Sequence, residues 1–230
     1  MENIFSLNKP SLVKTPIFID GFGRTGKLLL GKIISCFNGI ENFQNVSLIE
    51  QIISIHLIGS ITQNAAIALI KAQIDQHTYH MYLGRNLNFR FDDATSLYNS
   101  LQMDEYLRRS LEPYSPKLKK EILNNKSKPL FVLHESFSGL KLLYEAYPKM
   151  KFIYLSRHPI DVVYSWFIND WGSRYKTDPL FTAPVVQTNN DLVPWHAADW
   201  KDEYVSLSNV DRVIKNISYL LDIEKKPILH

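Results

Sequence analysis

Cysteine is nearly absent from this sequence, which has a single one, Cys36, among 230 residues. One cysteine excludes an intramolecular disulfide and suits a reducing compartment, so we expect a cytoplasmic protein. The seven histidines and this cysteine form no clustered metal-ligand pattern. We therefore expect a protein that requires no metal.

A strong net charge is also lacking. The chain has 26 Lys and Arg against 23 Asp and Glu, which gives a formal net charge of +3. The basic run 117–128 is interrupted by Glu121, Ile122 and Leu123, which is typical of a solvated helix face. We therefore expect no nucleic-acid partner.

No long apolar run stands out. Residues 1–15 are interrupted by polar and proline residues and do not form a signal peptide. The stretch 51–70 has no Asp, Glu, Lys or Arg, but its Gln, Ser, Thr and Asn favour two packed helices hinged near Gly59 over a transmembrane segment. Hydrophobic residues make up 45% of the chain and no linker divides it, so we expect residues 1–230 to form one domain.

A glycine-rich turn is the clearest motif that is present. Gly21-Phe22-Gly23-Arg24-Thr25-Gly26-Lys27 follows the apolar run 16–20 and precedes the apolar run 28–37, which predicts strand, turn and helix. Such a turn presents several N–H groups to one anion at a helix N-terminus, and Arg24 and Lys27 add positive charge. The spacing fits G-x-x-x-x-G-K-[S/T] except that Leu28 replaces the hydroxyl that would bind Mg²⁺. The motif indicates phosphate binding without metal, although glycines can also serve a simple tight turn.

A second candidate anion site follows another short strand. Residues 152–156 are apolar and β-rich, and Arg157-His158-Pro159 then opens a helix that runs to about Asn169. Arg157 at the strand end and Ser165 in the helix could both reach one phosphate over the strand tips. The alternative is a surface arginine and a solvated serine. Two anion sites after two parallel strands suggest one ligand with separated phosphates.

In these two motifs the chain resembles the sulfotransferases that use 3′-phosphoadenosine 5′-phosphosulfate (PAPS). Their loop G-x-G-R-S-G-T-x-L-L is similar to residues 21–30, and their motif R-[N/D/H]-P-x-D-V-x-x-S matches residues 157–165 position for position. The resemblance covers about residues 16–170, and the segment 195–221 also looks similar. It implies a three-layer α/β/α fold with a central parallel sheet, of the P-loop NTPase-like sulfotransferase type.

The resemblance also implies a donor site and a mechanism. An acceptor hydroxyl or amine would displace the 3′,5′-diphosphate in line, without metal, with Arg24 and Lys27 stabilising the leaving oxygen. Lys27 stands where the family has a small hydroxyl residue, so its amine either contacts the bridging oxygens or crowds the cradle. The implied cofactor-binding residues are Gly21, Phe22, Gly23, Arg24, Thr25, Gly26, Lys27 and Leu28 for the 5′-phosphosulfate, and Arg157 and Ser165 for the 3′-phosphate.

His134 is the first candidate for the catalytic base. It follows the apolar strand 129–133, where cytosolic-type sulfotransferases carry a histidine, and imidazole titrates near neutral pH. The alternative is that His134 only bonds nearby backbone. Other branches of the family use a glutamate after the first helix, which makes Glu50 the second candidate and Glu41 a weaker one.

The remaining segments leave the acceptor open. The long loop 82–93 carries Arg85 and Arg90, which could meet an acidic acceptor or pair with Asp92 and Asp93. The Pro-rich segment 176–195 predicts a lid or acceptor loop without regular structure. Trp195 and Trp200 are expected in the core, although they could stack on an acceptor. A helix over about 209–221 is expected to place Val210, Val213, Ile217, Leu220 and Leu221 on one packed face.

We therefore expect a PAPS-dependent sulfotransferase that acts on a small-molecule, carbohydrate or lipid acceptor. The family would add another strand at about the apolar end 226–230, which suggests a C-terminally truncated member. The alternatives are a catalytically decayed binding protein of this fold and a P-loop nucleotide kinase. The kinase would need the missing hydroxyl at Leu28.

Overall fold

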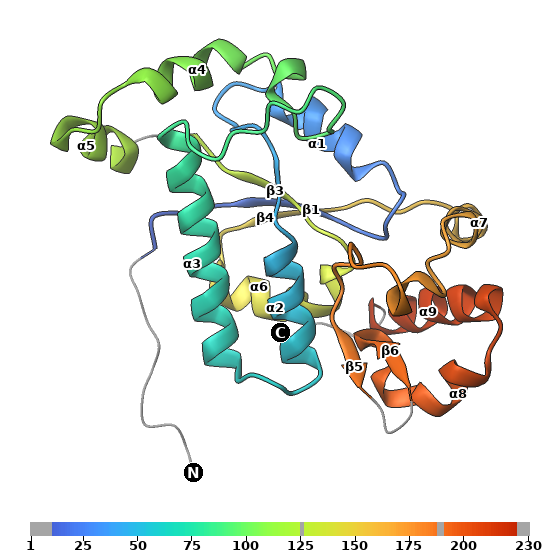
Figure 1. Cartoon of the computed structure of the whole chain (residues 1–230). Helices are drawn as coiled ribbons and strands as arrows, with labels where there is room; N and C mark the ends of the chain where they lie inside the picture. The colour runs from blue at the N-terminus through green and yellow to red at the C-terminus, as the bar shows by residue number, and fades with distance from the viewer. Residues whose placement is uncertain (1–10, 125–126, 188–190, 225–230) are drawn as a thin grey trace.

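The computed structural model describes residues 11–124, 127–187 and 191–224 (Figure 1). Its centre is a four-stranded sheet in the order β2-β3-β1-β4, and all of its strand pairs are parallel. The strands are β1 (Ile17–Asp20), β2 (Gln44–Asn45), β3 (Leu130–Val132) and β4 (Lys151–Tyr154). Every residue of β1 and β3 is buried, as expected for apolar runs covered on both faces.

Helices cover both faces of this sheet. On one face Phe18 and Phe131 pack with apolar residues of α2 (Ser47–Leu57), α3 (Gln63–Tyr82) and α6 (Leu140–Ala146). On the other face Ile19 and Val132 pack with residues of α1 (Lys27–Ser35). Figure 1 shows α1 on the side of the sheet opposite to α2, α3 and α6. The predicted three-layer α/β/α fold with a central parallel sheet is confirmed.

The charge-free stretch 51–70 forms the two predicted helices. Helix α2 ends at Leu57, Gly59 adopts a φ of 76°, and the hydroxyl of Thr62 accepts a hydrogen bond from the N–H of Ala65 at the start of α3. Glycine tolerates this left-handed turn at no steric cost. In the described ranges, no helix has the length and apolarity needed to cross a membrane.

Two helices lie near the β2 edge of the sheet. The loop before them is irregular, as predicted. These helices are α4 (Met103–Leu111) and α5 (Pro116–Asn124). In the loop, Arg90 Nε lies 3.2 Å from Asp93 Oδ1, which is one of the predicted pairings. Arg90 therefore contributes to the loop itself.

The C-terminal part differs from expectation in one segment. Residues predicted as an irregular lid include an antiparallel hairpin of β5 (Val185–Gln187) and β6 (Leu192–Pro194). Prolines do not prevent it, because Pro184 precedes β5 and Pro194 is the last residue of β6, where no further ladder bond is needed. Helices α7 (Pro159–Ile168), α8 (Lys201–Ser206) and α9 (Asn209–Glu224) complete this part, with α9 packed on α7.

The predicted apolar face of α9 is correct except at one end. Val213, Ile217 and Leu220 are almost fully buried, whereas Val210 is 37% exposed. Trp195 is 7% exposed and packs in the same core as Val213. Trp200 packs edge-on against Tyr204 at 5.2 Å between ring centroids. Both tryptophans therefore pack against neighbouring side chains.

Candidate active site

The glycine-rich turn lies at the carboxyl end of β1, beside the end of β4. Gly21 has a φ of 141°, and a Cβ placed there would lie 2.1 Å from the carbonyl oxygen of Leu155. Only glycine fits this close approach. Arg24 and Gly26 also adopt positive φ values, of 70° and 96°. The turn thus folds sharply and leads directly into α1.

Side chains from outside the turn hold its first half. Glu135 Oε1 accepts a hydrogen bond from the N–H of Gly23 at 2.6 Å, and Trp166 Nε1 donates to the carbonyl of Gly23 at 3.1 Å. Thr25 Oγ1 donates to the carbonyl of Phe22 at 2.9 Å. The Phe22 ring packs edge-on against Phe137. Because Gly23 already has partners for both backbone groups, the second half of the turn is the part open to a ligand.

Lys27 takes a position that neither sequence-based alternative described. Its side chain is 2% exposed, and its amine donates to the carbonyls of Phe22, at 2.6 Å, and of Gly21. Burial lowers the pKa of Lys27, while the carboxylates of Glu135 and Asp20 act in the opposite direction. The amine therefore stabilises the turn through hydrogen bonds to its carbonyls. A direct contact with a bound sulfonate donor would require the amine to leave these carbonyls.

The second half of the turn presents an uncapped helix N-terminus. Gly26 is the N-cap of α1, no side chain caps it, and the first turn contains no acidic residue. The N–H groups of Lys27, Leu28 and Leu29 consequently have no partner within the helix. The side chain of Leu28 packs on the sheet, so only its backbone faces the turn. A Cβ built on Gly26 would meet nothing within 4 Å, so the space beside the turn is open. This end of the helix suits an anion.

Arg24, Arg157 and Ser165 come together beside it. Arg24 Nε donates to Ser165 Oγ at 3.2 Å, and Arg157 Nη1 donates to the carbonyl of Arg24 at 3.2 Å. Arg157 is exposed and also lies 3.4 Å from Asp161 Oδ2. The Arg24 guanidinium therefore bonds the hydroxyl of Ser165, and the Arg157 guanidinium is tied to the backbone of Arg24. The donor set of this cluster fits a phosphate, and the uncapped helix start nearby fits a second one.

His134 and Glu50, the two candidate bases, form one pair. Glu50 Oε1 accepts hydrogen bonds from the backbone N–H of His134 and from its ring Nδ1, both at 3.0 Å. The carboxylate assigns the proton to Nδ1, which leaves Nε2 as the proton acceptor. The side chains of His134 and Glu50 are 26% and 16% exposed. The pair can therefore reach a ligand from a mostly buried position.

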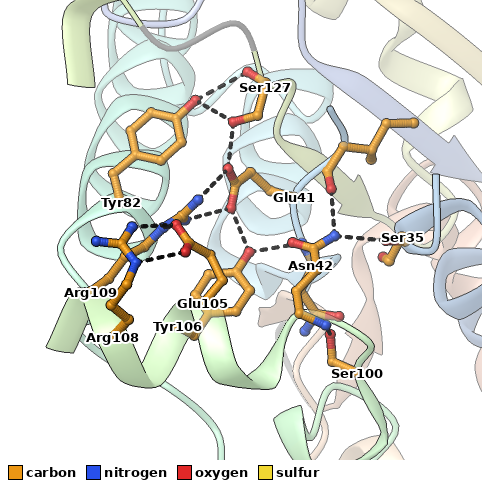
Figure 2. A network of polar contacts seen from close by, with 12 residues as sticks. Ser35, Glu41, Asn42, Tyr82, Ser100, Glu105, Tyr106, Arg108, Arg109 and Ser127 are labelled. Atoms are coloured by element: carbon orange, nitrogen blue, oxygen red, sulfur yellow. Dashed lines mark hydrogen bonds and ion pairs between the residues drawn. The ribbon is translucent and has the colours of Figure 1, made fainter. Parts of the chain in front are cut away.

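Glu41, the weaker candidate, lies at the opposite end of the sheet. Its N–H donates to the carbonyl of Lys128, which precedes β3, whereas His134 follows β3. Figure 2 shows its carboxylate within a polar network, where it accepts bonds from Tyr106 Oη at 2.5 Å and Arg109 Nη1 at 2.8 Å. The Glu41 carboxylate also accepts a bond from the hydroxyl of Ser127. Glu41 therefore lies away from His134 and the glycine-rich turn, and its position disfavours it as a base.

A cavity of about 400 Å³ opens beside the His134 and Glu50 pair. Trp166 and Trp171 form part of its wall, with ring centroids 4.7 Å apart. A Cβ placed on Gly23 would lie 2.4 Å from the ring of Trp171, so the cavity borders the glycine-rich turn. The cavity is lined by Asn45, Ser47, Glu50, Gln51, Ser54, His134, Glu135, Trp166, Trp171, Arg174, Leu180, Phe181, Thr182, Ala183, Pro184, Trp195, His196 and Asn216.

A family model described as "Sulfotransferase family" matches residues 16–216 of the chain. The chain belongs to the sulfotransferase family. A search among curated proteins finds no match. Family membership supports sulfonate transfer in general, and it confirms the family resemblance of the two sequence motifs. Within the described ranges, no group of three or more metal-ligating side chains occurs that could hold a metal ion.

Two acidic residues of this sulfotransferase site were missed by the sequence analysis. Glu135 has a φ of 51°, a left-handed conformation that is uncommon outside glycine and that turns its carboxylate back toward Gly23. Asp20 is fully buried at the end of β1, and neither carboxylate oxygen has a hydrogen-bond partner among the described residues. Burial raises the pKa of Asp20 to about 7, against the positive charge of Lys27. The sequence offered one signal for each residue. Asp20 stands at the end of an apolar strand, and Glu135 directly follows the candidate base His134.

Proposed function

We propose that this sulfotransferase moves a sulfonate group from PAPS to a hydroxyl or amine of an acceptor bound in the cavity. The observation that carries the proposal is the His134 and Glu50 pair, which lines the cavity next to Glu135, whose carboxylate bonds Gly23 of the glycine-rich turn. When bound, PAPS supplies the activated sulfonate. The residues of the chain then have to hold the donor, orient the acceptor and take its proton.

Donor binding is proposed for the two anion-binding features of the strand tips. Arg24, Arg157 and Ser165 would hold the 3′-phosphate, because they offer two guanidinium groups and a hydroxyl in one cluster. The N–H groups at the start of α1 would hold the 5′-phosphosulfate, aided by the helix dipole. Lys27 would act indirectly, by keeping the carbonyls of Gly21 and Phe22 turned away from the donor.

His134 is the proposed base and Glu50 its orienting partner. With Nδ1–H donated to Glu50, the Nε2 atom can accept the proton of an acceptor hydroxyl as the new oxygen–sulfur bond forms. The carboxylate of Glu50 stabilises the imidazolium that results, as in other carboxylate and histidine pairs. The two residues that the sequence offered as alternatives thus serve one proton transfer.

Isothermal titration calorimetry with adenosine 3′,5′-diphosphate, in magnesium-free buffer, tests the donor site. The expected result is metal-independent binding that ATP does not match. Absence of binding would point to the decayed binding protein, and preference for ATP with Mg²⁺ would favour the kinase. Either result would overturn the proposed function.

A further inference from the structure

One peptide group of the glycine-rich turn is held from both sides. The carbonyl of Phe22 accepts a hydrogen bond from the Lys27 amine at 2.6 Å, and the N–H of Gly23 donates to Glu135 Oε1, also at 2.6 Å. The carbonyl and the N–H of one trans peptide group point in opposite directions. Lys27 and Glu135 therefore lie on opposite sides of the peptide between Phe22 and Gly23 and bind its two ends.

The charges of these two side chains match the dipole of the peptide group. Its oxygen, which is the negative end, meets an ammonium group, and its N–H meets a carboxylate. Burial raises the pKa of Glu135, and the positive charge of Lys27 acts against this rise. Burial lowers the pKa of Lys27, and the Glu135 carboxylate is the largest of the charges that oppose this change. Each side chain is thus the counter-charge of the other, with the peptide group between them.

Glu135 is bound to the turn through its backbone as well. Its N–H donates to the carbonyl of Gly21 at 3.2 Å, and its own carbonyl accepts a bond from Ser138 Oγ at 2.9 Å. Its φ of 51° is left-handed, a conformation that is unfavourable for a residue with a Cβ and that persists only where the surroundings impose it. Residue 135 is therefore fixed to the turn by two hydrogen bonds, one from its backbone and one to its side chain.

The same two side chains join the turn to the rest of the site. Lys27 is the first residue of α1, whose uncapped N–H groups we propose for the 5′-phosphosulfate. Glu135 directly follows His134, the proposed base. If the peptide between Phe22 and Gly23 reversed, an oxygen would replace the N–H on the side of the carboxylate, which can only accept hydrogen bonds when charged. The two side chains therefore allow one orientation of this peptide.

We infer that Glu135 is a positioning residue of the donor site: together with Lys27 it fixes the peptide between Phe22 and Gly23, and thereby the shape of the turn that receives the 5′-phosphosulfate. This inference rests on the proposed function and adds a residue to its donor site. Glu135 acts through the turn, because its carboxylate stays on Gly23 while the donor binds the N–H groups at the start of α1.

Two nucleotides that differ by one phosphate test the inference by calorimetry. Adenosine 3′,5′-diphosphate carries the 5′-phosphate that the turn would bind, and adenosine 3′-monophosphate lacks it. Glu135→Gly removes the carboxylate, and glycine tolerates the left-handed φ. The affinity of this variant for the diphosphate should fall about tenfold or more, the scale of one hydrogen bond to a charged group, while that for the monophosphate stays unchanged. An equal change for both nucleotides, or no change for either, would overturn the inference.

Two further variants separate the hydrogen bond from other effects. Glu135→Gln keeps an acceptor oxygen for Gly23 and should stay within about threefold of the parent affinity for the diphosphate. Asn86→Gly is the matched backbone control, because Asn86 is exposed, has a φ of 52° and is not among the residues that line the cavity. It should bind both nucleotides as the parent does. A loss in Glu135→Gln as large as in Glu135→Gly, or an equal loss in the control, would contradict the role of the hydrogen bond.

Hydrogen exchange of the parent protein tests the same bond without any substitution. The amide of Gly23 should be protected from exchange in the absence of nucleotide, because its N–H is bonded to Glu135. Exchange as fast as in an exposed loop would overturn the inference, even if Glu135→Gly failed to fold.

The failure of this inference can be told apart from failure of the proposed function. A parent protein that does not bind the diphosphate loses the function and, with it, the inference. A parent protein that binds the diphosphate, with a Glu135→Gly variant that binds it equally well, keeps the function and loses the inference.

Discussion

Glu41 and Glu50 are close in sequence but lie at opposite ends of the sheet, and their partners differ in kind. Glu41 is 1% exposed and is bound by Arg109, whose charge is fixed, and by the hydroxyls of Tyr106 and Ser127. Glu50 is 16% exposed and is bound by His134, whose charge can change. Figure 2 shows the contacts of Glu41 with Tyr106, Arg109 and Ser127.

The difference separates a carboxylate held by a fixed charge from the one that we propose for the active site. A carboxylate paired with arginine and hydroxyl groups has no partner that takes up a proton. Removing one member of such a buried ion pair leaves the other charge buried without its partner. A carboxylate paired with an imidazole orients a ring nitrogen that can accept a proton from a substrate. The Glu50 pair also borders a cavity, whereas Glu41 is not among the residues that line it. Changes at the two ends should therefore affect different observables.

The largest effect is expected for His134→Ala. Removing the base should lower kcat about 100- to 10,000-fold, the usual contribution of general base catalysis, while the affinity for adenosine 3′,5′-diphosphate stays unchanged. Steady-state kinetics and calorimetry on the same preparation measure both quantities. Turnover close to that of the parent protein would exclude His134 as the base, and a parallel loss of diphosphate affinity would indicate a collapsed site instead.

The second-largest effect is expected at Glu41 and concerns the free energy of unfolding. Glu41→Gln removes the buried carboxylate that binds Arg109, which then keeps only the more exposed Glu105, and should lower the free energy of unfolding by about 3 kcal/mol. Glu50→Gln is the matched change at the other end, and it should lower kcat about 100-fold because the amide can favour the wrong imidazole tautomer. Urea unfolding and kcat, measured on both variants, should show the opposite ranking. The same ranking in both assays would remove the distinction between the two carboxylates.

A third prediction concerns the donor end of the site. Arg157→Ala should weaken binding of adenosine 3′,5′-diphosphate by about 2 to 3 kcal/mol, or about 30- to 150-fold, as for the loss of a charge-assisted hydrogen bond. Its side chain is exposed, so unfolding in urea should change little. Calorimetry checks the affinity. An unchanged dissociation constant would remove Arg157 from the donor site.

The sequence predicted the sheet and the strand tips because their signals are local. Apolar strands followed by Gly21 or Arg157 are continuous patterns, and parallel strands bring their carboxyl ends to one edge. The expected meeting of Arg157 with Ser165 needs only a short helix between them. What these local signals could not show was the bond from Arg24 to Ser165, since it joins two distant segments.

The features that the sequence could not predict depend on contacts between residues that are far apart in the chain. Glu50 and His134 were alternatives in the sequence because nothing local indicates that α2 brings one to the other. Glu41 was a candidate because its partner Arg109 lies far along the chain. The Lys27 side chain is buried under the turn, where its amine bonds the carbonyl of Phe22, and no rule of residue spacing predicts this position. The hairpin of β5 and β6 was missed because its prolines lie at positions where a strand tolerates them.

The smallest expected effect extends the comparison to a carboxylate without fixed partners. Asp20 is as deeply buried as Glu41, but its oxygens have no hydrogen-bond partner among the described residues. Burial raises the pKa of Asp20 from 3.8 to about 7, so the folded protein binds more protons than the unfolded chain between these values. The contribution of Asp20 to stability is therefore fully present below about pH 4 and is lost as the pH rises through about 7.

The variant Asp20→Asn removes this titration, so its unfolding free energy should fall less than that of the parent protein as the pH rises from about 5 to about 8. Over this range the parent protein should lose on the order of 2 kcal/mol more unfolding free energy than the variant. Urea unfolding of both proteins at several pH values measures this difference. Parallel pH profiles for the parent and the Asp20 variant would mean that Asp20 keeps its charge in the folded protein, with Lys27 as an effective counter-ion beneath the turn.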